Sequence, residues 1–245
     1  MRFLVPEFVW PKCVFIDGAR ITIRNAPYSF GVKRVLKLGE YEFEERRLLA
    51  NILHPGDVVV EMGGSIGILT AIIAAKVGTS GFVVSVEASA KLTEYSRTWL
   101  EAGNNVKVLV GCGFPVWDLK HPIAIQNFEQ KWGSMSGRVT FSTAPVATTN
   151  ERNQPGLPVY DLRTLSAFAK QPPVTLVVDI EGSESIMCSQ KPEFPQSLRN
   201  LLIELHPGMY GEDAKTEIIR RIEEEGFKQL ATEGNVFLFT RVPAP

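Results

Sequence analysis

Short apolar runs alternate with amphipathic helical patterns from residue 57 onward, and this order limits the possible folds more than any other feature. Apolar residues in short continuous runs are typical of buried strands, whereas spacings of three and four are typical of helices. A strand followed by a helix and another strand builds a parallel sheet with helices on its faces. The order therefore predicts an α/β fold. The expected strands are 58–61, 82–87, 106–110, 174–179, 201–205 and 236–240, and the expected helices are 66–77, 89–103, 161–170 and 213–226.

The first part of the chain lies outside this alternation. Residues 1–40 are expected to form a β-rich N-terminal extension, because a hairpin pattern surrounds Asp17-Gly18 and residues 32–38 read as a further extended stretch. An amphipathic helix is expected at 41–53, and His54-Pro55-Gly56 ends it.

A second segment interrupts the alternation after the third strand. Residues 111–160 are rich in Gly, Pro, Ser, Thr and Asn. Loops at the edge of a sheet often carry specificity. We interpret this segment as an insertion on the substrate side of a single domain that spans residues 1–245.

Composition excludes several classes of protein. The 26 basic and 27 acidic residues give a net charge of −1, which does not favour a nucleic-acid partner. No run approaches the roughly 20 apolar residues that cross a bilayer, and the first ten residues lack the apolar core of a signal peptide. The three cysteines are widely spaced, without a metal-binding pattern. A cytoplasmic protein with no membrane partner is expected, and its oligomeric state is left open.

The first strand leads into a glycine-rich turn, Glu61-Met62-Gly63-Gly64-Ser65-Ile66-Gly67, before a helix. Ligands of open parallel sheets bind beyond the carboxyl ends of the strands, where glycines allow close approach of the backbone. The next strand ends in Glu87, whose carboxylate can accept hydrogen bonds from both hydroxyls of a ribose. The turn and the acid together predict a nucleoside-containing cofactor.

Two cofactors with a nucleoside come into question, a dinucleotide such as NAD and S-adenosylmethionine. A dinucleotide site requires G-x-G-x-x-G, which this turn does not have, and Glu61 would repel a pyrophosphate. An acid at this place suits the cationic amino-acid end of S-adenosylmethionine. An NAD-dependent oxidoreductase is therefore the weaker alternative. A protein that keeps the fold without catalysis is another, because the glycines could serve only a tight turn.

Several motifs resemble those of the FkbM-type methyltransferases. The resemblance rests on Gly39-Glu40-Tyr41-Glu42, on residues 53–67, on Ser85-Val86-Glu87-Ala88-Ser89, on Val178-Asp179-Ile180-Glu181-Gly182-Ser183-Glu184, and on Glu204 and His206. It implies a Rossmann-like class I fold with a seven-stranded, mostly parallel sheet. It also implies an S-adenosylmethionine-dependent O-methyltransferase that acts on a hydroxyl of a sugar, a glycan or a polyketide metabolite.

The resemblance places the cofactor on the turns. Glu61 stands where the family has Asp, and Gly64-Ser65 stands where it has Ala-Asn. The third strand is followed by Gly111-Cys112-Gly113, without the acid that often reaches adenine, so Cys112 is expected beside that ring. The expected cofactor-binding residues are Glu61, Gly63, Gly64, Ser65, Gly67, Glu87, Ala88 and Cys112.

The acceptor is expected at the ends of the fourth and fifth strands. Asp179, Glu181 and His206 are the candidate catalytic residues, because a hydroxyl must lose its proton as the methyl group arrives. Their types also suit a divalent ion, but nothing in their spacing demands one, so no metal is expected. Trp132, Ser134 and Ser136 in the insertion are the expected substrate-binding residues.

Overall fold

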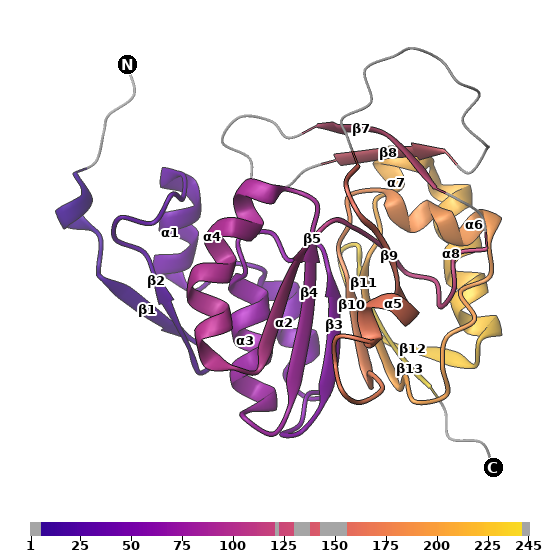
Figure 1. Ribbon diagram of the computed structural model, residues 1–245, viewed down its shortest axis with the longest axis horizontal. Helices are drawn as coiled ribbons and strands as arrows, with labels where there is room; N and C mark the ends of the chain where they lie inside the picture. Colours follow the sequence, from indigo (N-terminus) through magenta and orange to yellow (C-terminus); the bar gives the residue numbers. More distant parts are fainter. Residues whose placement is uncertain (1–5, 121–122, 130–137, 143–155, 242–245) are drawn as a thin grey trace.

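A twisted seven-stranded sheet forms the centre of the computed structural model, which describes residues 6–120, 123–129, 138–142 and 156–241 (Figure 1). The strands lie in the order β12-β13-β11-β10-β3-β4-β5. All neighbouring pairs from β11 to β5 are parallel, and β13 runs antiparallel to both of its neighbours. This confirms the predicted α/β Rossmann-like class I methyltransferase fold. The strands are β3 (Val58–Met62), β4 (Phe82–Glu87), β5 (Val106–Val110), β10 (Thr175–Val178), β11 (Asn200–Glu204), β12 (Phe227–Glu233) and β13 (Val236–Arg241).

Helices cover both faces of the sheet, as the sequence predicted. One face packs on α2 (Phe43–Leu49), α3 (Ile68–Val77) and α4 (Ala90–Leu100). The other packs on α5 (Leu162–Ser166), α6 (Ile186–Ser189) and α8 (Glu212–Glu224). Successive residues of a strand point to opposite faces, so β3 sends Val59 to the first core and Val60 to the second. Because β3 is buried on both faces, its sequence is continuously apolar before Glu61.

The chain changes direction across the sheet between β3 and β10. From β3 it moves outward through β4 to the edge strand β5, and it later returns to form β10 on the other side of β3. Val178 of β10 then pairs with Met62 of β3. A crevice beyond the carboxyl ends of such a pair is the usual ligand site of this kind of sheet. The glycine turn after β3 and Asp179 after β10 meet there.

The N-terminal extension contains both a hairpin and a helix. The hairpin of β1 (Cys13–Ile16) and β2 (Ala19–Thr22) confirms the first expectation. The extended stretch predicted at 32–38 is wrong, because α1 (Phe30–Leu38) is helical. Ser29 caps it by accepting a hydrogen bond from Val32 N, and Gly39 ends it in the left-handed region. The extension lies beside α3 and α4 (Figure 1). Its apolar side chains form one core cluster with residues of these helices.

The described part of the insertion adds two small ladders. β6 (Cys112–Phe114) pairs in parallel with β9 (Val159–Asp161), and β7 (Ala124–Glu129) forms a hairpin with β8 (Arg138–Ser142). β8 contacts the short helix η3 (Ser183–Ser185), and the ring of Phe141 packs on Phe114. The hairpin of β7 and β8 therefore lies near the carboxyl end of β10, where the acceptor was predicted.

The other elements differ from the predictions mainly at their ends. The helix expected at 41–53 is α2, and the one expected at 161–170 is α5, which Asp161 caps through Thr164 N. Strands β6, β7, β9 and β12 were not predicted. The remaining short elements are η1 (Glu7–Val9), η2 (Glu101–Gly103) and α7 (Pro207–Tyr210). In the described ranges, no helix has the length and apolar character that crossing a membrane requires.

Candidate active site

A cavity opens at the point where the chain crosses between β3 and β10. We call it the main cavity. It contains seven of the residues that the sequence predicted for the site, namely Gly63, Ser65, Glu87, Ala88, Cys112, Asp179 and Glu181. The other lining residues are Tyr41, Glu42, Val86, Gly111, Gly113, Ile180 and Ser183. Glu61, Gly64, Gly67 and His206 do not line it.

Glu87 ends β4 with its carboxylate held against backbone. Its Oε2 accepts a hydrogen bond from Ser65 N at 2.9 Å, and its Oε1 accepts one from Ser89 N at 2.7 Å. Burial raises the pKa of this carboxyl, and the backbone hydrogen bonds work against that rise. These contacts fix the carboxylate in the wall of the main cavity. The sequence predicted that this carboxylate accepts hydrogen bonds from the hydroxyls of a ribose.

Glu61, which the sequence predicted as a cofactor contact, is buried on the α3 side of β3 and does not line the main cavity. It is 2% exposed, and the hydroxyl of Thr70 on α3 donates to its Oε2. Two-residue alternation explains this position, because Glu61 shares the face of Val59 under the helices. Burial raises its pKa, and hydrogen bonds from Ser85 and Thr70 lower it. Glu61 therefore joins β3 to α3 across the glycine turn, on the side of β3 that faces the helix.

The glycines of the turn are required by packing. A Cβ on Gly63, whose φ is +95°, would overlap the backbone carbonyl of Asp179, and one on Gly64 would overlap the hydroxyl of Ser85. Gly67 faces Leu100 of α4 in the same way. The turn is thus pressed against the neighbouring strands, which brings the ends of β3 and β10 together.

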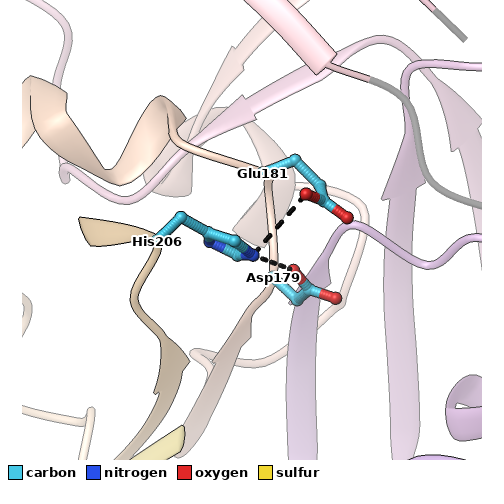
Figure 2. A group of neighbouring side chains, drawn as sticks. All are labelled: Asp179, Glu181 and His206. Atoms are coloured by element: carbon cyan, nitrogen blue, oxygen red, sulfur yellow. Dashed lines mark ion pairs between the residues drawn. The ribbon is translucent and has the colours of Figure 1, made fainter. Parts of the chain in front are cut away.

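Asp179, Glu181 and His206 converge at the end of the sheet, as predicted (Figure 2). His206 Nε2 lies 3.6 Å from Asp179 Oδ1 and 3.6 Å from Glu181 Oε2. Glu204 Oε1 is 4.0 Å from the same nitrogen. One imidazole nitrogen therefore faces a group of carboxylates, two of which belong to the wall of the main cavity.

The second imidazole nitrogen has its own partner. Nδ1 of His206 lies 3.2 Å from Glu184 Oε1, which also accepts a hydrogen bond from Ile180 N. Burial by itself lowers the pKa of His206, but the hydrogen bond to Glu184 and the nearby carboxylates outweigh it and raise the pKa to about 9. The imidazole is therefore cationic at neutral pH when nothing else neutralises the carboxylates.

Asp179 has one oxygen that solvent does not reach, although its side chain as a whole is 37% exposed. Its Oδ1 atom is buried and accepts no hydrogen bond within the described part of the chain. Burial raises the pKa of Asp179 well above its ordinary value, Glu204 raises it further, and His206 lowers it. The side chain stands between the main cavity and His206.

A second, smaller cavity adjoins the main one behind Asp179. Its acidic lining consists of Glu42, Glu45, Glu61, Asp179 and Glu204. Glu42 begins α2 with φ +46°, and burial raises its pKa well above the ordinary value, with Glu45 and Asp179 adding to the rise. Tyr41 and Glu42 also line the main cavity. Among the described residues, neither lining includes a lysine, an arginine or a histidine.

The other predicted contacts have different outcomes. Cys112 lines the main cavity and is 4% exposed. Burial raises the pKa of its thiol to about 12, with Glu87 adding to the rise, so it is a neutral apolar contact. Trp132, Ser134 and Ser136 lie outside the described residues. The sequence did not single out Gly113 or Ile180, which became apparent only when the strand ends were brought together.

Comparison with known proteins gives one match to a family model. The model described as protein-L-isoaspartate(D-aspartate) O-methyltransferase matches residues 45–124. That segment runs from α2 through the glycine turn and Glu87 to β7 and covers less than half of the chain. A search of curated proteins gives no match.

Comparison with solved structures gives matches with TM-scores below 0.5. Fibrillarin from Aeropyrum pernix, with natively bound S-adenosyl-L-methionine, is 10% identical over 77% of this chain and 68% of its own, with a TM-score of 0.45. A TehB-like methyltransferase from Corynebacterium glutamicum is 10% identical over 86% and 95%, with a TM-score of 0.45. A protein-L-isoaspartate O-methyltransferase is 33% identical over 28% and 22%, with a TM-score of 0.25. The fold assignment rests on the strand order itself.

The family match and the strand order support the same class of enzyme. Together they indicate a methyltransferase that uses S-adenosylmethionine. The cavity fits that cofactor, because its sulfonium and ammonium groups are cationic and the polar wall is acidic. Glu87, Ala88 and Cys112, which the sequence predicted beside the adenosine part, line this cavity together with Gly63 and Ser65 of the turn.

Proposed function

We propose that this methyltransferase acts on a hydroxyl group of a small-molecule or glycan acceptor, such as a sugar or a glycosylated or polyketide metabolite. S-adenosylmethionine supplies an electrophilic methyl group bonded to sulfur. The observation that carries the proposal is the position of Asp179 and Glu181, which share the wall of one cavity with Glu87. The nucleoside end and the acidic end of the cavity are thus adjacent.

The acidic end suits a neutral acceptor. Transfer to a hydroxyl would break the bond between the methyl group and sulfur, leave S-adenosylhomocysteine and form a carbon–oxygen bond. The hydroxyl proton is released, and Asp179 or Glu181 can take it up. Before transfer, the same carboxylates accept a hydrogen bond from the hydroxyl and orient its oxygen, and orientation alone contributes much of the rate of such reactions. In this proposal, the insertion that contacts η3 would cover the acceptor.

Anionic acceptors are opposed by the same charges. The acceptor named for the matched family, protein L-isoaspartate, reacts through a carboxylate, which Asp179 and Glu181 would repel. A nucleic acid would bring phosphates toward a wall with no cation among its described residues. The hydroxyl proposal therefore agrees with the charge of the site better than either alternative does.

Transfer of an isotope-labelled methyl group tests the proposal. The full chain is incubated with S-adenosylmethionine and, separately, with sugars and glycosylated metabolites, an isoaspartyl peptide, and bulk RNA. Label is expected in the sugars or the glycosylated metabolites and in neither the peptide nor the RNA. Glu181→Gln should reduce it by at least about tenfold, while the exposed Glu193→Gln leaves it unchanged. Labelling of the peptide or the RNA would overturn the acceptor class. Binding of S-adenosylhomocysteine without transfer to any acceptor would favour a non-catalytic protein, and NAD binding would favour an oxidoreductase.

A further inference from the structure

The group in Figure 2 combines two carboxylates and an imidazole at the ends of adjacent strands. One potential ligand atom from each of Asp179, Glu181 and His206 lies within 4.8 Å of the others. Ligands around one small divalent ion are about 3 to 4.4 Å apart when each bond is about 2.1 to 2.2 Å long. Asp179 Oδ1 and Glu181 Oε2 already lie 3.6 Å from His206 Nε2. Small side-chain movements would place all three on one ion.

Two buried oxygens at this group have no hydrogen-bond partner in the described part of the chain. One is Asp179 Oδ1, the atom that faces His206. The other is Oε2 of Glu184, whose side chain is 0% exposed and whose Oε1 contacts His206 Nδ1. A buried carboxylate oxygen without a hydrogen-bond partner is costly, and an ion bound by Asp179 Oδ1 would supply that atom with a partner.

Glu184 also sets the direction of the imidazole. Because its carboxylate takes the Nδ1 side at 3.2 Å, Nε2 is left to face Asp179 and Glu181. Histidines that bind metals usually donate their other ring N–H to a carboxylate in this way. Since Asp179 and Glu181 also line the main cavity, an ion held here would have coordination positions open to it.

We propose that Asp179, Glu181 and His206 bind one divalent metal ion beside the main cavity, with Glu184 positioning His206. A single imidazole with two carboxylates suits a first-row ion such as Mn²⁺ better than Ca²⁺, which takes more oxygen ligands. The proposal does not depend on which acceptor is methylated, because it uses only the geometry of these side chains.

Titration with Mn²⁺ tests the site. The full-length chain is treated with a chelator, and bound Mn²⁺ is then measured from the loss of the free-ion signal in electron paramagnetic resonance. One ion per chain is expected. Glu181→Gln and His206→Gln should each weaken binding by at least about tenfold, whereas Glu212→Gln on the exposed side of α8 should leave it unchanged. Thermal unfolding of each variant checks that it is folded, and Asp179→Asn replaces any variant that is not.

Two results would overturn the metal proposal. One is a lack of saturable binding at Mn²⁺ concentrations up to about 1 mM, which corresponds to a weak site. The other is binding that neither variant changes, which would place the ion elsewhere. Calorimetric titration of the same samples with S-adenosylhomocysteine keeps the two proposals apart. If that ligand binds and Mn²⁺ does not, the metal site fails alone; if only Mn²⁺ binds, the methyltransferase proposal fails alone.

Discussion

The carboxylate of Glu87 accepts a hydrogen bond from the backbone N–H of Ser65 across 2.9 Å. This contact joins the end of β4 to the turn after β3. The side chain proposed to bind the ribose thus also holds the turn that carries Gly63. Shape of the cavity and affinity for the cofactor therefore depend on the same carboxylate.

Replacement of Glu87 by Ala should remove most of the affinity for S-adenosylhomocysteine. Hydrogen bonds to a charged group contribute about 1.5 to 3 kcal/mol each, so a loss of at least about tenfold is expected in calorimetric titration. Glu94→Ala, on the exposed side of α4, is the matched control and should bind like the native chain. Unchanged affinity in the Glu87 variant would contradict the ribose assignment.

Replacement of Gly63 by Ala should strongly destabilise the fold. The added Cβ would overlap the carbonyl of Asp179, so β3 and β10 would have to move apart, at a cost of about 3 kcal/mol or more. Urea unfolding measures the change.

Gly78→Ala serves as the control for backbone strain in that experiment. Gly78 also has a positive φ, +66°, but a Cβ there meets nothing within 4 Å. A cost of about 1 to 3 kcal/mol is expected from its backbone alone, because φ +66° with ψ −171° is a conformation that few residues other than glycine adopt. Equal losses in the two variants would show that packing against Asp179 is not what requires Gly63.

Replacement of Glu45 by Gln should stabilise the protein at pH 8. Burial raises the pKa of Glu45 to about 7, and its Oε2 has no hydrogen-bond partner among the described residues. The folded state then binds more protons than the unfolded state between about pH 4.5 and 7, so this carboxyl lowers stability as pH rises through that window. Removing the charge should add about 1 to 3 kcal/mol at pH 8 and little at pH 4.

The adjacent residue offers a matched control. Glu44 is exposed on the same turn of α2, and its charge contributes to the raised pKa of Glu45, so Glu44→Gln should change the pH dependence of unfolding in the same direction but by less than Glu45→Gln does. Urea unfolding of the three proteins at pH 4 and pH 8 provides the comparison. If the native chain and the Glu45 variant respond alike to pH, Glu45 is not the buried acid that the structure shows.

Cys112 should resist alkylation at pH 8. With a pKa of about 12 and 4% exposure, its thiol has almost no reactive thiolate at this pH. Peptide mass spectrometry after iodoacetamide treatment should find Cys112 modified at least about tenfold more slowly in the folded chain than in urea. Equal rates in both conditions would mean that the cavity wall around Cys112 opens freely.

The sequence predicted the fold wherever one strong pattern controlled an element. The apolar strands β3, β4 and β5 were found almost to the residue, because burial on both faces demands continuous apolar runs. Helix α1 was missed because its β-branched residues Val32 and Val35 favour strands, although Val32, Val35 and Leu38 have the three-residue spacing of a helix and Ser29 caps it. Strand β12 was missed because most of its side chains are exposed.

Only the part of the site that lies at strand ends could be predicted from the sequence. Glu87, Asp179 and Glu181 follow strands, so their meeting at one edge follows from the parallel order. The face to which Glu61 points depends on the alternation within β3, and its carboxylate lies beneath α3, at the smaller cavity and not at the main one. The burial of Glu45 and Glu184 comes from long-range packing, which local patterns do not contain.

The pairing of Met62 with Val178 has a consequence for synthesis. A ribosome delivers the glycine turn early, but the wall that contains Asp179 follows only after the whole insertion has been made. A nascent chain that stops before β10 has half of a binding site and an uncovered flank on β3. The cavity is therefore completed only after β10 has been made and has paired with β3. A partly made chain is unable to bind its ligand before that pairing.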